Sequence, residues 1–206
     1  MGRVACLIAS VVCACLVGAC APAAGTASAT PSLDRQIQGE MAAHDAVTWS
    51  APRRLRWSDF ASGAPKTGTA DEGALTAYSI FYGVRCAGET FEFGALAGFL
   101  PHESWVKPEV VADRAMSERT LRHEQTHFDL TEVFARRLRK AFVDLYQPCR
   151  RADTDLEALA SQYLRAEKAE QQRYDDETHH GLVAAEQTAW DRQVAGDLAS
   201  LGTYAR

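Results

Sequence analysis

Residues 118–146 read ERTLRHEQTHFDLTEVFARRLRKAFVDLY, and this stretch decides the architecture of the second half of the chain. Its large apolar residues recur mostly at spacings of three and four, at Leu121, Leu130, Val133, Phe134, Leu138, Phe142 and Leu145. That period predicts a long amphipathic helix with one buried face. Ser117 is a candidate N-cap, and Pro148 follows the predicted C-terminus.

The segments on either side of this helix differ in character. Downstream, a second helical region runs from about residue 155 to residue 201, with an interruption at Gly181. Upstream, β-branched and aromatic runs alternate with Gly-rich breaks, and the candidate strands are residues 55–57, 75–82 and 91–95. A mostly β half followed by long C-terminal helices predicts an α+β fold.

The composition is that of one globular domain with appendages. The 206 residues include 22 Lys and Arg against 27 Asp and Glu, which gives a net charge of −5. Because phosphate binding needs a clustered basic face, nucleic acid is not an expected partner. The composition also excludes collagen, a disordered acidic tail and a polytopic membrane protein. We therefore expect a single monomeric domain.

The first 19 residues are typical of an export signal. Arg3 precedes an apolar run over residues 4–19, which is short for a membrane span but suits a signal peptide. The run ends in Val-Gly-Ala before Cys20, a pattern that resembles a bacterial lipobox, in which the Cys becomes the lipidated N-terminus. Cleavage after the Ala-Ser-Ala of residues 27–29 is the alternative. The first reading predicts a membrane-anchored lipoprotein facing the periplasm or cell surface, and the second a soluble secreted protein.

The remaining cysteines are consistent with export. Loss of residues 1–19 and lipidation of Cys20 would leave only Cys86 and Cys149. Two thiols in an oxidising compartment predict a disulfide, and two buried free thiols are the alternative. We expect residues 20–46 to comprise the lipidated Cys, a tether and a lead-in, and residues 47–201 to form the domain.

The long helix contains the motif that carries chemistry, His123-Glu124-Gln125-Thr126-His127. Residues four apart lie on the same side of a helix, so both imidazoles can reach one metal ion. Imidazole nitrogen suits Zn²⁺, which makes zinc the expected cofactor. Glu124 is then placed to act as the general base that activates a zinc-bound water.

Catalytic zinc needs a third protein ligand, because such sites usually have three ligands and a water. Antiparallel packing of the two helical regions would bring residues 174–181 beside the motif. His180 is the preferred candidate, and His179 or one of the acids Asp175, Asp176 and Glu177 are the alternatives, as ligands or as acceptors that orient a ligand.

Other polar and aromatic residues have weaker claims. Asp129 should face away from the ligand side of the helix, in a supporting or capping role. Tyr174 could polarise a substrate oxygen through its phenol, although packing is the simpler role. Trp57, Trp105 and Trp190 are expected in the core, and His44 and His102 are expected in solvent.

Several motifs occur in an order that resembles one known family. They are Leu-Arg-Trp-Ser-Asp-Phe at residues 55–60, Phe99 with Ser104-Trp105-Val106, the helix motif at residues 121–129, and Tyr174-Asp175 with Thr178 and His180-Gly181. Together they resemble a bacterial domain of unknown function described as predicted secreted zinc-dependent proteases, over about residues 47–195. Thr126 stands where that family's H-E-Q-G-H has Gly. The resemblance implies an exported, zincin-like metallopeptidase, and it favours His180 over His179.

A zincin-like arrangement implies an edge strand across the metal cleft that binds extended substrate by strand addition, and residues 91–100 are the candidate. The sequence thus predicts a zinc metalloprotease that hydrolyses peptide bonds of a protein or peptide substrate in the cell envelope. The alternatives are a non-catalytic envelope lipoprotein with a structural zinc site and a zinc amidase that acts on peptidoglycan.

Overall fold

The computed structural model describes residues 32–66 and 72–206, which belong to one compact unit, Pro31–Arg206. The predicted signal peptide, the lipidation site at Cys20 and nearly all of the tether lie outside the described residues. None of the described helices combines the length and the apolar character that crossing a membrane requires.

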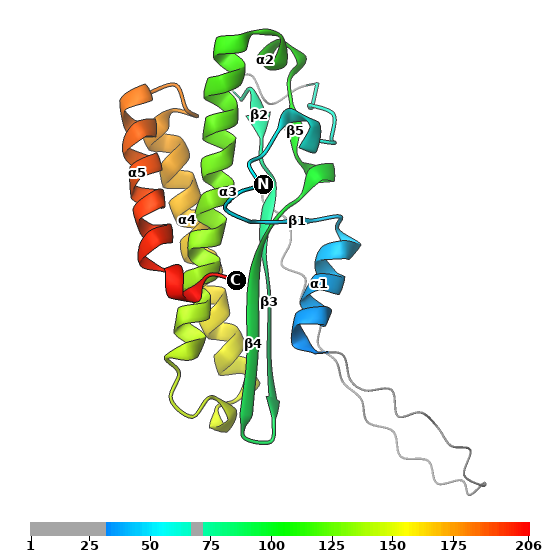
Figure 1. Ribbon diagram of the computed structural model, residues 1–206, viewed down its shortest axis with the longest axis vertical. Coiled ribbons are helices and arrows are strands. Elements are labelled where there is room, and N and C mark those ends of the chain that lie inside the picture. Colours follow the sequence, from blue (N-terminus) through cyan, green and yellow to red (C-terminus); the bar gives the residue numbers. More distant parts are fainter. Residues whose placement is uncertain (1–31, 67–71) are drawn as a thin grey trace, which may run out of the picture. The chain divides into compact units, whose positions relative to one another are not determined.

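The fold is α+β, as predicted, with strands in the first half and long helices in the second (Figure 1). The helices are α1 (Leu33–Ala43), α2 (Pro108–Ala112), α3 (Arg114–Val143), α4 (Asp153–Thr178) and α5 (Ala184–Ser200). The strands are β1 (Val47–Thr48), β2 (Ala74–Leu75), β3 (Tyr78–Ala87), β4 (Thr90–Phe99) and β5 (Trp105–Val106). Short 3₁₀ turns cover Trp57–Asp59, Pro101–Glu103, Pro148–Arg150 and Gly202–Tyr204.

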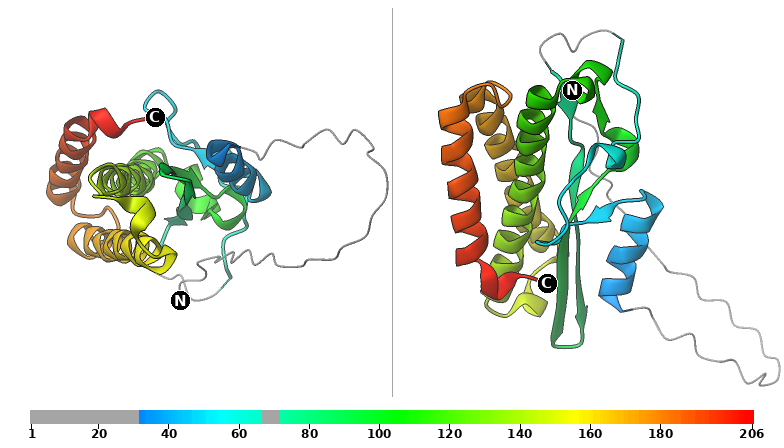
Figure 2. Two further views of the ribbon diagram at one scale, coloured as in Figure 1. Left: turned by 90° about the horizontal axis from the view of Figure 1, so that it is seen from below. Right: turned by 45° about the horizontal axis from the view of Figure 1, so that its top comes forward.

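A long hairpin of β3 and β4 forms the centre of the main sheet. The two strands pair antiparallel from Tyr78 opposite Phe99 to Ala87 opposite Thr90, and β1 pairs with the end of β4. Helix α3 packs against one face of this sheet, α4 and α5 pack on α3, and α1 covers the other face of the hairpin (Figure 2). Gly94 permits that close approach, because a Cβ there would lie 2.7 Å from Ile37 Cδ1 of α1.

The predicted disulfide between Cys86 and Cys149 is present. It joins the far end of β3 to the turn between α3 and α4, so it fixes the sheet to the helical layer. With a sequence separation of 63 residues, the chain-entropy model gives it a contribution of about 4 kcal/mol to stability.

Two predictions about the β half were wrong. Residues 55–57 are not a strand, because the Leu55 amide donates to Gln125 Oε1 of α3 at 2.7 Å and a 3₁₀ turn begins at Trp57. The run over residues 75–82 is divided, since β2 pairs with β5 and only from Tyr78 does the chain join β4.

The helices also differ from their predicted limits. Helix α3 begins before Ser117, because Asp113 caps it by accepting a hydrogen bond from the Met116 amide at 2.8 Å. The Ser117 hydroxyl instead accepts from Trp57 Nε1 at 2.7 Å. Helix α1 lies within the predicted lead-in, and its residues Leu33, Ile37 and Met41 are buried against the hairpin. The folded unit therefore includes residues before 47.

Candidate metal centre

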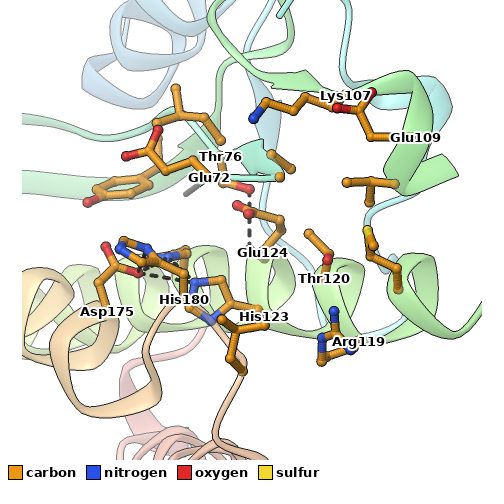
Figure 3. Close-up of a pocket in the computed structure, with 18 residues that line it drawn as sticks. Glu72, Thr76, Lys107, Glu109, Arg119, Thr120, His123, Glu124, Asp175 and His180 are labelled. Atoms are coloured by element: carbon orange, nitrogen blue, oxygen red, sulfur yellow. Dashed lines mark hydrogen bonds and ion pairs between the residues drawn. The ribbon is translucent and has the colours of Figure 1, made fainter. Parts of the chain in front are cut away.

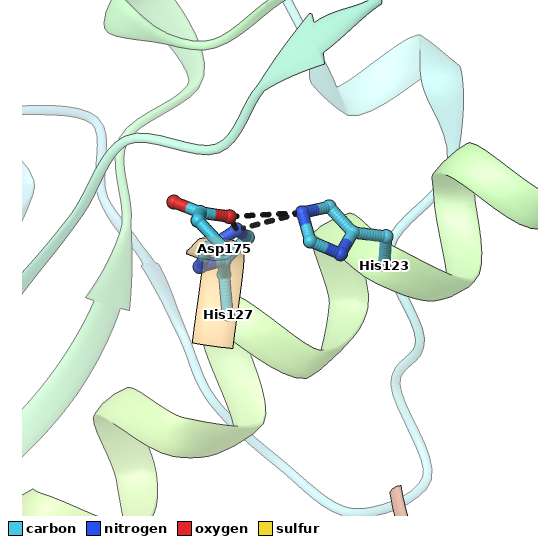
Figure 4. Close-up of side chains that lie close together, drawn as sticks. All are labelled: His123, His127 and Asp175. Atoms are coloured by element: carbon cyan, nitrogen blue, oxygen red, sulfur yellow. Dashed lines mark hydrogen bonds and ion pairs between the residues drawn. The ribbon is translucent and has the colours of Figure 1, made fainter. Parts of the chain in front are cut away.

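Two imidazoles and one carboxylate converge between α3 and α4 (Figure 4). His123 and His127 lie one turn apart on α3, and Asp175 comes from the last turn of α4. Asp175 Oδ1 lies 3.1 Å from His123 Nε2 and 2.9 Å from His127 Nε2, and the two Nε2 atoms are 3.1 Å apart. The antiparallel packing predicted from the sequence thus brings the end of α4 to the motif.

The break between α4 and α5 holds this arrangement close to α3. His179, His180 and Gly181 all have positive φ, so the chain turns sharply directly after α4. Gly181 is needed here, because its φ is +80° and a Cβ would lie 2.9 Å from His123 Cβ. The sequence predicted an interruption at Gly181. The glycine there also lets the turn between α4 and α5 pack closely against His123, a candidate ligand.

The three donor atoms lie close enough together to share one metal ion. Ligands at 2.0–2.1 Å from a tetrahedral Zn²⁺ are about 3.3–3.4 Å apart, only a few tenths of an ångström more than the observed separations. In the metal-free protein a proton on an imidazole Nε2 can join it to Asp175 by a hydrogen bond across these distances, and a metal ion would take the place of that proton. His123, His127 and Asp175 are therefore the residues that could hold zinc.

The pKa values of His127 and Asp175 also indicate a position that favours positive charge. Burial lowers the pKa of His127, but its hydrogen bond and ion pair with Asp175 outweigh this and raise the pKa to about 9. Burial raises the pKa of Asp175, but the hydrogen bonds from the two imidazoles hold it well below its usual range. A proton on His127 thus supplies positive charge at the place where a metal ion would supply it.

Glu124 points into a cavity of about 340 Å³ that lies along α3 (Figure 3). Asp175 and His180 lie at one end of this cavity, and Lys107 and Glu109 lie at the other. Only 4% of the Glu124 residue is exposed, and no hydrogen bond or ion pair joins its carboxylate to another of residues 32–66 and 72–206, so the carboxylate opens to the cavity. Thr76 Oγ1 bonds the Glu124 backbone carbonyl instead, at 3.4 Å.

The two predicted histidine candidates for the third position lie outside the close cluster. His180 Nδ1 is 3.6 Å from Asp175 Oδ1, and its side chain is 44% exposed at the cavity edge. His179 is the exposed C-cap of α4. The structure thus brings Asp175, one of the alternatives, closest to His123 and His127.

The neighbouring acids on α4 have other partners. Asp176 is exposed and accepts from Gln172, and Glu177 accepts from Trp190 Nε1 at 2.8 Å. Asp129 faces away from the cluster, as expected, and accepts from Trp49 Nε1 and Gln125 Nε2, both at 2.8 Å.

Tyr174 has the packing role. Its ring stacks on His123 with centroids 4.6 Å apart, and the whole residue is buried. Its hydroxyl donates to Gln187 Oε1, 2.8 Å away, rather than pointing into the cavity, which agrees with the packing role that the sequence favoured over action on a substrate oxygen.

The remaining sequence predictions concern bulky and solvent-facing residues. Trp105 and Trp190 are buried in the core, and Trp57 is partly buried against it. His44 and His102 are exposed, as expected.

The strand beside the candidate centre is not the one expected. Strand β4 is paired with β3 along its whole length, and its other edge is covered where Trp49, Arg139 and Arg206 donate to the carbonyls of residues 97, 95 and 93. The cavity is bordered instead by residues 72–76 around β2 and by Tyr78, whose ring stacks on His127.

Two glutamines that the sequence did not single out contact the candidate ligands. Gln171 Oε1 lies 2.7 Å from His127 Nδ1, and Gln187 Oε1 lies 3.2 Å from His123 Nδ1. A Gln inside a helix carries little signal by itself. Glu167, Gln171, Tyr174 and Thr178, however, follow helical spacing on the face of α4 that Leu156 and Ala160 already mark as buried.

Glu167, beside Gln171, should make stability depend on pH. Burial raises its pKa from 4.5 to about 7, against hydrogen bonds from Gln171 and Thr131 that lower it. Between these values the folded protein holds a proton that the unfolded chain has lost, so the free energy of unfolding falls as pH rises, by about 3 kcal/mol at most. Glu167→Gln should remove this loss and be more stable than the parent at pH 8.

Urea unfolding of zinc-free protein at pH 4, 6 and 8 measures this effect. Asp176→Asn, an exposed acid on the same helix, is the matched control and should follow the parent. A Glu167→Gln variant that loses stability between pH 4 and 8 as steeply as the parent would refute the assignment.

Comparison with protein families finds a match for the central part of the chain. Residues 100–181 match the model of a family described as "Bacterial protein of unknown function (DUF922)". The matched segment includes α2, α3 and α4, and therefore all three residues of the cluster together with Glu124. It is shorter than the 47–195 of the resemblance and stops before α5, which carries Gln187. No curated protein and no solved structure matches the chain at a significant level.

Proposed function

We propose that the protein is a zinc-dependent hydrolase that cleaves peptide bonds in the cell envelope. The observation that carries this proposal is the carboxylate of Glu124, which faces a cavity that also exposes the His123, His127 and Asp175 cluster and has no partner among the described residues. A carboxylate that faces a cavity instead of a protein partner is free to accept a proton from water bound there.

His123, His127 and Asp175 would hold the zinc ion, with the exposed His180 beside them at the cavity edge. Bound zinc would supply a Lewis acid that polarises a carbonyl and lowers the pKa of water. Glu124 would accept a proton from the attacking water and deliver it to the leaving amine. Tyr78, whose pKa is raised by burial and by nearby carboxylates, would stay a neutral hydroxyl in the cavity wall.

The open cavity favours catalysis over a purely structural zinc site. A structural site is closed by four protein ligands, whereas a catalytic one keeps a position for water and substrate. Three donor atoms of the described residues converge here, and the cavity reaches them. The disulfide between Cys86 and Cys149 supports an oxidising compartment outside the cytoplasm, as the predicted export signal does.

Zinc content and hydrolysis measured on one purified preparation test the proposal. We expect one zinc per chain and zinc-dependent cleavage of an unfolded, fluorescently labelled protein. Release of peptides from peptidoglycan without cleavage of the protein would indicate the amidase alternative. One zinc per chain with no hydrolysis of either substrate would indicate a structural site and refute the proposal.

A further inference from the structure

The two candidate histidine ligands have matching environments on the side away from the cluster. Each ring presents Nε2 to Asp175 and Nδ1 to a buried glutamine carbonyl oxygen, Gln171 for His127 and Gln187 for His123. The glutamines come from different helices, α4 and α5, and are 2% and 1% exposed. The same contact is therefore built twice from independent parts of the chain.

The amide of each glutamine is held in one orientation by what surrounds its nitrogen. Gln171 Nε2 donates to Glu167 Oε1 at 2.8 Å and to the His127 carbonyl at 3.0 Å. Gln187 Nε2 donates to Asp191 Oδ1 at 2.8 Å. Turning either amide over would place its oxygen against another acceptor, so the oxygen must face the imidazole.

Because a carbonyl oxygen only accepts, each Nδ1 must carry a hydrogen, and in a neutral ring the Nε2 lone pair then faces the cluster. We propose that Gln171 and Gln187 are positioning residues that fix the tautomer and ring orientation of His127 and His123 for metal binding. Glu167 and Asp191, each four residues from its glutamine along the helix, hold the two amides in place. This inference rests on the metal site of the proposed function.

A packing role alone would not need this pattern. Buried amides are costly unless all their groups are paired, and an apolar side chain of the same size would fill the space at lower cost. The pattern also gives α5 a purpose in the site, since α5 contributes no ligand yet holds the ring of His123 through Gln187.

Zinc affinity of variants that differ only in the acceptor tests the proposal. Gln171→Met and Gln187→Met keep the size of the side chain and remove the oxygen. Each is expected to bind zinc 10–100-fold more weakly than the parent, the range typical of such supporting contacts. Gln172→Met on α4 and Gln193→Met on α5, both exposed, are the matched controls and should bind as the parent does.

Exchanging the residues at positions 167 and 171 of α4 distinguishes a positioning role of Gln171 from a packing role. In the double variant Glu167→Gln with Gln171→Glu, the residue at 171 still accepts from His127 Nδ1, and the amide at 167 donates to it. This variant should bind zinc at least tenfold more tightly than Gln171→Met. Imidazole ¹⁵N chemical shifts of the zinc-loaded protein should show the hydrogen on Nδ1 of both rings in the parent and a mixture of Nδ1 and Nε2 hydrogens in the Met variants.

The outcomes distinguish this proposal from the function. Met variants that bind zinc as the parent does, or an exchanged pair no better than Gln171→Met, would overturn the positioning role alone. A parent that binds zinc and shows the expected variant series but hydrolyses nothing would refute only the hydrolase. A parent that binds no zinc would overturn both.

Discussion

Glu124→Gln is expected to lower the rate of peptide hydrolysis roughly 10²–10⁴-fold while one zinc ion stays bound per chain. The carboxylate of Glu124 is not part of the cluster formed by His123, His127 and Asp175. The amide has nearly the same shape, so the cavity and the helix should be unchanged. What the variant loses is the ability to accept a proton from water.

Activity and zinc content should be measured on the same preparations. Glu118→Gln is the control, because Glu118 is an exposed acid on the same helix that pairs with Arg114. It should retain parental activity. If Glu124→Gln hydrolyses the substrate within tenfold of the parent rate, Glu124 is not the base, and the unpaired carboxylate needs another explanation.

The sequence predicted those parts of the site that depend on residue spacing within a single helix. The period of α3 gave its buried face, and the spacing of His123 and His127 placed both imidazoles on one side. Gly181 marked the break after α4, because a glycine that interrupts a helical pattern can be recognised in the sequence without knowing which residues it contacts. The pairing of Cys86 with Cys149 followed from the lack of any other cysteine in the predicted domain.

The parts that the sequence left open depend on contacts between elements. Which of residues 175–180 reaches the cluster is decided by where α4 ends, and α4 ends at Thr178, so Asp175 lies on its last turn and His180 lies beyond it. The resemblance to a protease family pointed to His180, and residue spacing alone could not separate these candidates. Strand β2 could not be told apart from the β-like run that follows it, because β2 has only two residues and pairs with β5, which lies about 30 residues further along the chain.

Helix α1 was missed for a similar reason. Its apolar residues Leu33, Ile37 and Met41 have helical spacing, but they follow small polar residues typical of a tether, and the stretch up to residue 46 was interpreted as a lead-in to the domain. The signal for its position lies in β3 and β4, where glycines such as Gly94 leave room for a helix on the outer face.

Asp175→Ala should weaken zinc binding far more than His180→Ala. Structural zinc sites bind with about 10–16 kcal/mol, so the loss of one ligand among four corresponds to about 3–4 kcal/mol, or roughly 10²–10³-fold in the dissociation constant. Asp175 Oδ1 lies within 3.1 Å of both Nε2 atoms, whereas the His180 side chain is 44% exposed, with Nδ1 3.6 Å from Asp175 Oδ1 and its ring centroid 6.4 Å from that of His123. For His180→Ala we expect less than a tenfold change.

Competition with a chelator of known affinity measures both constants, and Asp176→Ala serves as the control on the exposed side of the same helix turn. The reverse order, with His180→Ala the weaker binder, would mean that zinc draws the loop of residues 179–183 inward and displaces Asp175. Asp175 would then act as the acceptor that orients His180, as the sequence allowed. Equal losses in both variants would indicate four protein ligands, which would close the position that hydrolysis requires.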